Sequence, residues 1–118
     1  MDTMHVDEIF LMKTHALLRY IGATNTTGIF QTAYAIALAH KQPCRLLMVT
    51  KWLYPSVAKH YGTAWTCVER NIRSTIASAW KNGGQRRLAN LGYLLTRRPR
   101  STEFITLLLT ILETDQAA

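Results

Sequence analysis

Residues 57–80 read VAKHYGTAWTCVERNIRSTIASAW. Ala58 is a small residue in the first half of this segment, and Gly62 follows four residues later. Val68 and Ile72 then recur at helical spacing, where they can pack back onto the first half. A helix-turn-helix joins two helices through a short turn, and glycine adopts the positive φ that such a turn often needs. The segment therefore predicts a helix-turn-helix, with an ordinary αα-hairpin as the alternative.

The second helix of this pair has a polar face opposite Val68, Ile72 and Ile76. The first turns of a recognition helix enter the major groove, where arginine binds guanine O6 and N7 and a carboxylate accepts from cytosine N4. The alternatives are a solvated charged face, or a capping box formed by Thr66 and Glu69. The predicted base-reading residues are Thr66, Cys67, Glu69, Arg70 and Arg73.

The positive charge of the chain is concentrated around this segment. Residues 50–100 carry ten basic side chains and one acidic one, whereas the whole chain has a formal net charge of +7. This balance suits nucleic acid or an acidic membrane surface. Phosphate contacts position a DNA-binding domain, although each such cation can equally be a solvated surface residue. The predicted phosphate contacts are Lys51, Lys59, Ser74, Arg86, Arg97, Arg98 and Arg100.

The rest of the chain predicts an all-α fold of about six helices. Its 118 residues are 48% apolar, which suits a single domain over residues 1–118. Leu46 to Val49 is an apolar run whose periodicity fits either an extended or a helical segment. Thr63 and Ser101 are predicted to cap the helices that follow them. Periodicity and helix breakers place helices at about residues 7–21, 28–40, 55–61, 63–81, 86–95 and 101–113.

Other functional classes find little support in the sequence. Cys44 and Cys67 make no disulfide framework, and no Cys/His spacing predicts a metal site. The four histidines are scattered without a catalytic motif, so we expect no enzyme and no cofactor. The acidic residues of the first eight positions argue against a signal peptide, and no apolar run is long enough to span a bilayer. We expect a cytoplasmic, nucleoid-associated protein.

Several motifs resemble one known family. They are VTK at 49–51, LYP at 53–55, VER at 68–70, AW at 79–80, LGY at 91–93 and STEFI at 101–105. This pattern is similar to the C-terminal effector domain of stage zero sporulation protein A, the response regulator that starts endospore formation. The resemblance covers about residues 9–113. It implies a six-helix, sequence-specific transcription factor whose base-reading side chains correspond to Glu69, Arg70 and Arg73.

Three features depart from the family pattern. Cys67 occupies the position of a base-reading arginine, so the resemblance does not carry over the family's DNA box. Trp65 stands where the family prefers a small residue, either as a core filler or as a contact to sugar or a thymine methyl. The family's phosphorylated receiver domain is not found within these residues, so we expect that phosphorylation does not switch them as it switches the family.

The sequence thus predicts binding to double-stranded DNA and no partner membrane. A homodimer or tandem arrangement on DNA and RNA polymerase are further candidate partners. The alternative function is a protein-interaction module that keeps this fold and has lost specific DNA reading.

Overall fold

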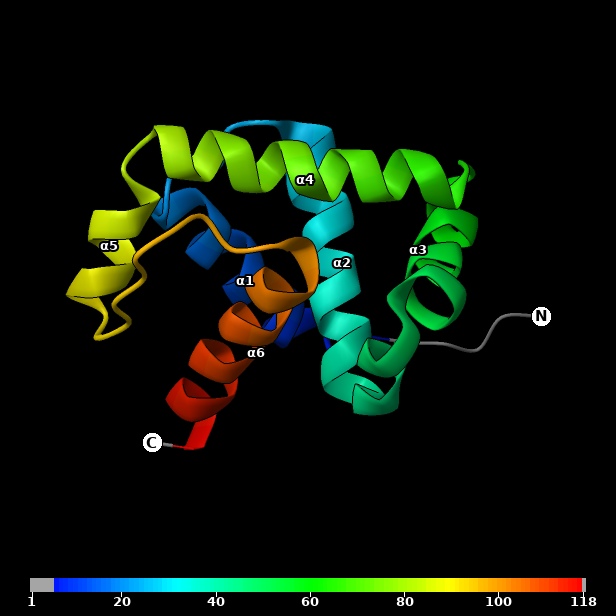
Figure 1. The fold of residues 1–118 in the computed structure, drawn as a ribbon. Coiled ribbons are helices and arrows are strands. Elements are labelled where there is room, and N and C mark those ends of the chain that lie inside the picture. Colours follow the sequence, from blue (N-terminus) through cyan, green and yellow to red (C-terminus); the bar gives the residue numbers. More distant parts are fainter. Residues whose placement is uncertain (1–5, 118) are drawn as a thin grey trace.

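The computed structural model describes residues 6–117, with side chains up to residue 114, and confirms the all-α class. Residues 1–5, which include Asp2, lie outside the described part. The helices and two short helical segments are arranged around one core (Figure 1). The elements are α1 (Glu8–Tyr20), α2 (Thr26–Lys41), η1 (Pro43–Met48), η2 (Val49–Leu53), α3 (Tyr54–Tyr61), α4 (Trp65–Lys81), α5 (Gly84–Asn90) and α6 (Ser101–Ala117).

Helix α2 forms the centre of the molecule. Its N-cap is Asn25, whose side-chain oxygen accepts from the backbone N–H of Gly28 at 3.2 Å, so the helix begins two residues before the predicted start. The stretch from Gln31 to Ala39 is buried without interruption. A helix that is apolar on all sides must be surrounded by other elements. Accordingly α1, α3, α4 and α6 all pack against α2.

Helix α4 crosses α2 at close range. A Cβ placed on Gly28 of α2 would lie 2.1 Å from Thr75 Oγ1 and 3.0 Å from the carbonyl oxygen of Asn71, both on α4. Only glycine fits at such a distance. Asn71 Nδ2 also donates to Gln31 Oε1 at 2.9 Å, which fixes the crossing with a side-chain hydrogen bond. These contacts set the position of α4 against the core.

The turn between α3 and α4 confirms the predicted glycine. Gly62 ends α3 with φ +67, in the left-handed region, and nothing lies within 4 Å of the position a Cβ would take. The N–H of Thr63 donates to the carbonyl of Ala58 at 2.9 Å, as in a Schellman motif. The predicted cap at Thr63 is wrong: Ala64 is the N-cap residue of α4, and its side chain makes no capping hydrogen bond.

The structure decides between the two alternatives for one other segment and corrects the bounds of another. The apolar run from Leu46 to Val49 is helical, because it spans the end of the 3-10 segment η1 and the start of the π-helical segment η2. The predicted helix at 86–95 is shifted: α5 ends at Asn90, where the N–H of Tyr93 donates to the carbonyl of Leu88 and reverses the chain. In the part of the chain that the structure describes, no helix could cross a bilayer.

Candidate nucleic-acid interface

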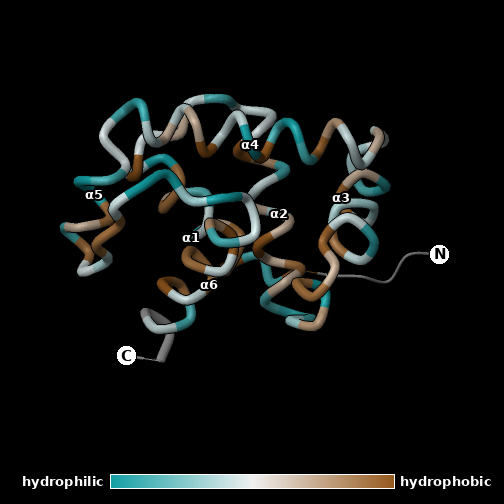
Figure 2. The backbone as a smooth tube through the Cα atoms, in the orientation of Figure 1, coloured by the Kyte–Doolittle hydropathy of each residue, from teal (hydrophilic) through white to brown (hydrophobic). Residues whose placement is uncertain are grey.

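Helix α4 has one buried face and one exposed face. Its buried side chains are Val68, Ile72, Thr75, Ile76 and Ala79, which point into the core. Thr66, Arg70, Arg73 and Ser74 are exposed on the outside. The polar face predicted from periodicity is therefore present, and it runs along the outer edge of the molecule (Figure 2).

Cys67 lies at the edge of that face rather than in the core. It is half-buried in the first turn of α4, and Arg70 Nη2 donates to its Sγ at 3.6 Å. A hydrogen bond with the Thr63 side chain lowers the pKa of the Cys67 thiol, and the Arg70 guanidinium adds to this, while partial burial opposes both. The structure thus brings Cys67 and Arg70 together at the end of α4 that follows the turn.

Trp65 is also at this end of the helix, and 40% of its surface is exposed. That exposure excludes a role as a fully buried core filler. Thr66 is the second residue of α4, after the N-cap at Ala64, so it does not form a capping box with Glu69.

Glu69 lies on the flank of α4 that faces α3 and α6. Burial raises the pKa of the Tyr54 phenol, a hydrogen bond with Ser101 lowers it, and Glu69 raises it further. Arg73 acts on the same phenol in the opposite direction. Glu69 and Arg73 therefore border a junction of three helices, whereas Thr66 and Arg70 point away from it.

A basic hollow opens beside this junction. It has a volume of about 320 Å³ and lies between α4 and the loop that leads into α6. The loop is mostly hydrophilic in Figure 2. The residues that line the hollow are Arg73, Ile76, Arg97, Arg98, Pro99, Arg100 and Ser101. Four arginines from two distant parts of the sequence thus surround one concave surface, and guanidinium groups suit an anionic ligand such as phosphate.

One of these arginines is held by a carboxylate. Arg97 makes two hydrogen bonds with Glu103, at 3.2 and 3.0 Å, and this pairing raises the pKa of Arg97 and lowers that of Glu103. Glu103 also accepts from the backbone N–H of Arg100 at 2.8 Å. A glutamate in the first turn of α6 thereby fixes the loop, in the manner of a capping box. Ser101 is the first residue of α6, and its predicted role as the cap is not found, since α6 begins there after Arg100.

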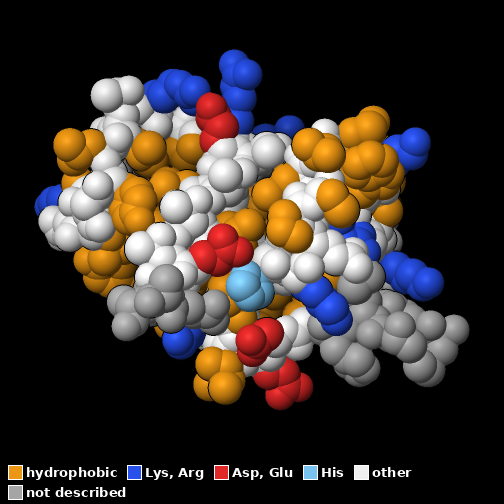
Figure 3. Space-filling model, turned by 90° about the horizontal axis from the view of Figure 1, so that it is seen from below, with side chains coloured by type: hydrophobic (Ala, Val, Ile, Leu, Met, Phe, Trp, Pro, Cys, Tyr) orange, Lys and Arg blue, Asp and Glu red, His pale blue; other side chains and the backbone are white. Residues whose placement is uncertain are grey.

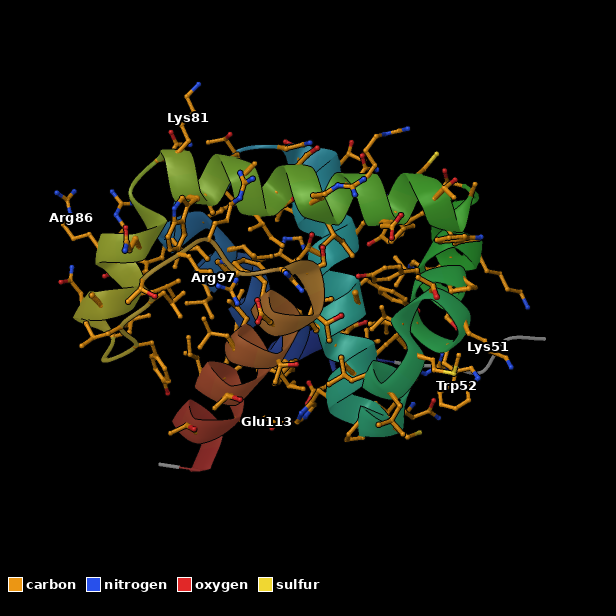
Figure 4. All side chains as sticks on the ribbon, viewed as in Figure 1. Lys51, Trp52, Lys81, Arg86, Arg97 and Glu113 are labelled. Atoms are coloured by element: carbon orange, nitrogen blue, oxygen red, sulfur yellow. The ribbon has the colours of Figure 1, made fainter. Side chains whose placement is uncertain are left out.

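The other predicted phosphate contacts are spread over the molecule. Lys59 is exposed in the last turn of α3, and Ser74 lies on α4. Arg86 is on α5, near the end of α4 that carries Lys81 (Figure 4). Lys51 lies on η2, well away from α4 in the same view. The structure thus gathers Arg73, Arg97, Arg98 and Arg100 and leaves Lys51 and Arg86 at opposite ends.

Sequence reasoning missed two features of this region. Thr63 contacts the Cys67 thiol, and Ser101 both lines the hollow and hydrogen-bonds the Tyr54 side chain. Both residues were singled out only as helix caps, since a polar residue before an apolar repeat is the usual cap signal. Within residues 6–114, no group of three or more metal-ligating side chains is found.

One family comparison fits this geometry. The family described as "Sporulation initiation factor Spo0A C terminal" matches residues 14–112, which is most of the chain. The chain belongs to this family. It is therefore a DNA-binding, non-enzymatic effector domain of a transcription regulator.

Proposed function

We propose that this family member binds double-stranded DNA in a sequence-specific manner, with the first turns of α4 in the major groove. Thr66 and Arg70 are exposed on these turns and would contact base edges. Glu69 lies in the same turn as Arg70, and Arg73 follows about one turn later. The observation that carries the proposal is the arginine-lined hollow beside α4. A helix in the groove needs a backbone anchor next to it, and the hollow supplies one.

The arginines of the hollow should contribute unequally to contacts with the DNA backbone. Arg98 and Arg100 line the hollow as exposed side chains, whereas Arg97 is partly neutralised by Glu103. Arg98 and Arg100 should therefore each release about one counterion on binding, and Arg97 should release less. Lys59 and Ser74 would reach phosphates on either side of the helix.

The wider role that we propose rests on family membership. The protein would act at the nucleoid in the cytoplasm as a regulator related to the initiation of sporulation. A second copy beside it on DNA and RNA polymerase are the partners that such a role implies.

Selection of bound duplexes from a random pool, followed by the variant Arg70→Ala, tests base reading. Arg70 is exposed, so its removal should leave thermal stability unchanged. Binding to selected duplexes should weaken by about 1–3 kcal/mol, with little change on random duplexes. Lys81→Ala, at the far end of the same helix, is the matched control. An equal loss on every duplex would make Arg70 a phosphate contact.

Salt dependence tests the hollow. Arg98→Ala should reduce the slope of log affinity against log salt by about 0.9 on selected and random duplexes alike. Arg97→Ala should reduce it by less. An unchanged slope for Arg98→Ala would place that arginine in solvent. A pool that yields no preferred duplex would instead favour the protein-interaction module.

A further inference from the structure

An apolar surface of the molecule is left uncovered at the end that carries η1 and η2. Leu47 is 76% exposed, Met48 is 48% exposed and Trp52 is 40% exposed. Leu46, Val49 and Leu53, between and beside them, face the core. The segment is therefore apolar on both sides, and its outer side is a patch of large hydrophobic side chains. We call the side chains of Leu47, Met48, Lys51 and Trp52 the η patch.

The η patch is formed by two consecutive helical segments. Leu47 and Met48 are the last residues of η1, Lys51 and Trp52 lie on η2, and the non-helical backbone of Met48 (φ −145, ψ 82) separates the two. Seen from below, hydrophobic side chains gather at the upper right of the molecule, over the η1 and η2 segments, with basic side chains at the margin (Figure 3). Contiguous exposed apolar side chains often mark sites of protein interaction.

The patch is held rigidly from beneath. Arg45 donates to Gln42 Oε1 at 2.7 Å and to Ser56 Oγ at 2.7 Å, and it also donates to the carbonyl of Trp52. The Arg45 guanidinium thus forms hydrogen bonds with residues at the end of α2, on η2 and on α3. A surface that is already ordered loses less entropy when a partner binds.

The charged side chain of the patch is Lys51, while Glu113 of α6 is paired with His40 at the end of α2. No aspartate or glutamate occurs between Ile9 and Val68 in the sequence, whereas Lys51 lies within the patch and Lys59 on the next helix. Among the described residues Lys51 makes no ion pair, and Figure 4 shows its side chain extending outward next to Trp52. A partner that covers this surface would bring apolar side chains to Trp52 and carboxylates to Lys51.

The η patch is separate from the proposed DNA interface. Figure 4 places Trp52 and Lys51 on the side of the molecule away from α4 and from the loop that carries Arg97. A partner can therefore occupy the patch while α4 lies in a groove. Tryptophan and methionine are enriched at the centres of protein interfaces, and DNA backbone offers little to bury them. A membrane-surface helix has a polar face rich in Lys and Arg, whereas η1 and η2 together carry Arg45 and Lys51.

We propose that the η patch is a docking surface for a protein partner that presents an acidic amphipathic helix. Leucine or phenylalanine side chains of that helix pack on Leu47, Met48 and Trp52, and its flanking carboxylates pair with Lys51. The interaction is independent of DNA binding, so that the bound partner is brought to the DNA site.

The test uses a synthetic helix of about sixteen residues, with Leu and Phe at the i, i+3, i+4 and i+7 positions and Glu elsewhere. Binding to the isotope-labelled 118-residue chain is followed by backbone amide chemical shifts, with and without a bound duplex. We expect shifts centred on Leu47, Met48 and Trp52 and a dissociation constant of roughly 10–100 μM, which is typical of a transient contact. A peptide of the same composition in scrambled order should bind at least about tenfold more weakly.

Two variants identify the surface. Leu47→Ser and Trp52→Ala should each weaken the peptide about tenfold and leave DNA binding unchanged. Leu94→Ser is the matched control, because Leu94 is 82% exposed in the loop after α5. Leu47 is so exposed that its variant folds even if Trp52→Ala does not. Lys51→Glu should weaken the peptide, whereas Lys81→Glu should not.

Four results would overturn the proposal. They are absence of shifts at about 1 mM peptide, equal binding of the scrambled peptide, an equal effect of Leu94→Ser, and shifts at the patch produced instead by anionic vesicles or a duplex. Concentration-dependent self-association that Leu47→Ser abolishes would assign the patch to a second copy of the chain and also overturn it. Loss of DNA binding by Arg70→Ala does not bear on these results, so the two proposals fail separately.

Discussion

Gly28→Ala tests whether the close crossing of α2 and α4 fixes the recognition helix. The added Cβ would lie 2.1 Å from Thr75 Oγ1, whereas ordinary contacts begin at 3.4 Å, so the two atoms must separate by more than 1 Å. Rotation of Thr75 would break its 2.8 Å hydrogen bond to the carbonyl of Asn71. That same carbonyl lies 3.0 Å from the new Cβ and, being backbone, cannot rotate away.

The expected loss of stability depends on how the clash is relieved, either by separation of the two helices or by rotation of Thr75. Overpacking costs about 1–3 kcal/mol, and an unsatisfied buried hydroxyl costs a similar amount. Replacing glycine by alanine in a helix returns up to about 1 kcal/mol. The net loss of unfolding free energy should be about 1–2 kcal/mol, which lowers Tm by roughly 4–8 °C for a chain of this size. Affinity for selected duplexes should fall as well, because α4 moves relative to the arginine-lined hollow.

Thermal and urea unfolding measure the effect, and a double-mutant cycle identifies its cause. Thr75→Ala removes the nearest atom, so Gly28→Ala should be less destabilising in that background by at least about 1 kcal/mol. If the two changes are additive, or if Gly28→Ala is as stable as the native chain, the crossing does not constrain α4 and the reasoning fails.

Three further predictions concern single sites. Glu103→Gln should destabilise the chain at neutral pH. The pairing with Arg97 lowers the pKa of Glu103, so the contribution of Glu103 to stability is fully present above the ordinary pKa of 4.5 and is lost as the pH falls through the lowered pKa. The unfolding curves of the native chain and the variant should therefore converge in acid. A difference that stays constant with pH would contradict the pairing. Gly62→Ala should cost about 1 kcal/mol, measured by urea unfolding, because φ is +67 although no neighbour blocks a Cβ; a loss above about 3 kcal/mol would require a clash. Thr63→Val should raise the pH at which the Cys67 thiol is alkylated, because the Thr63 hydrogen bond is the main cause of its lowered pKa; an unchanged profile would remove Thr63 as the cause.

Short-range features of the sequence were sufficient to predict the helix-turn-helix. The turn at Gly62 depends on one residue's conformational freedom, and the faces of α4 follow from the spacing of Val68, Ile72 and Ile76. Both signals lie within a few residues of the features they predict. Tyr61 shows where such reasoning stops: its hydroxyl donates to the carbonyl of Phe30 and its ring contacts Tyr34, both on α2, and no local signal predicts these contacts.

The segments without regular periodicity could not be placed from sequence. Leu46 and Val49, three residues apart, pack on the core while Leu47 and Met48 are exposed, which is a helical spacing. The sequence shows only four consecutive apolar residues there, and such a run does not indicate which of its side chains will be buried. The end of α5 at Asn90 depends on the return of the chain towards α6, which is a tertiary requirement. The length of α5 was therefore overestimated at its C-terminal end.

The candidate site was predictable as a set of residues and not as an arrangement. Arg97, Arg98 and Arg100 stood out as a charged cluster, but only the structure brings them to Arg73. Sequence also gave no reason to pair Arg97 with Glu103, because glutamate in a first helical turn already has a role at the helix dipole. Long-range electrostatics of this kind depend on how the loop crosses α4.

Cys67→Arg tests the point where the chain departs from its family's base-reading pattern. Cys67 is half-buried in the first turn of α4, and its thiol contacts Arg70 at 3.6 Å. An arginine there has room to extend into solvent beside Arg70, and the like-charge pair should cost only about 0.2–0.5 kcal/mol of stability. On the DNA box recognised by the family, the variant should gain about 1–3 kcal/mol of discrimination at one guanine.

Cys44→Arg is the control, because it adds the same charge at an exposed position on η1. It should strengthen binding to all duplexes slightly and discriminate between none of them. Affinities for the box and for a version with that base pair exchanged separate the two effects, and Cys67→Lys serves as a second variant should Cys67→Arg not fold. If both cysteine variants gain equally on every duplex, the first turn of α4 does not reach the bases, and the protein-interaction module becomes the better description of this chain.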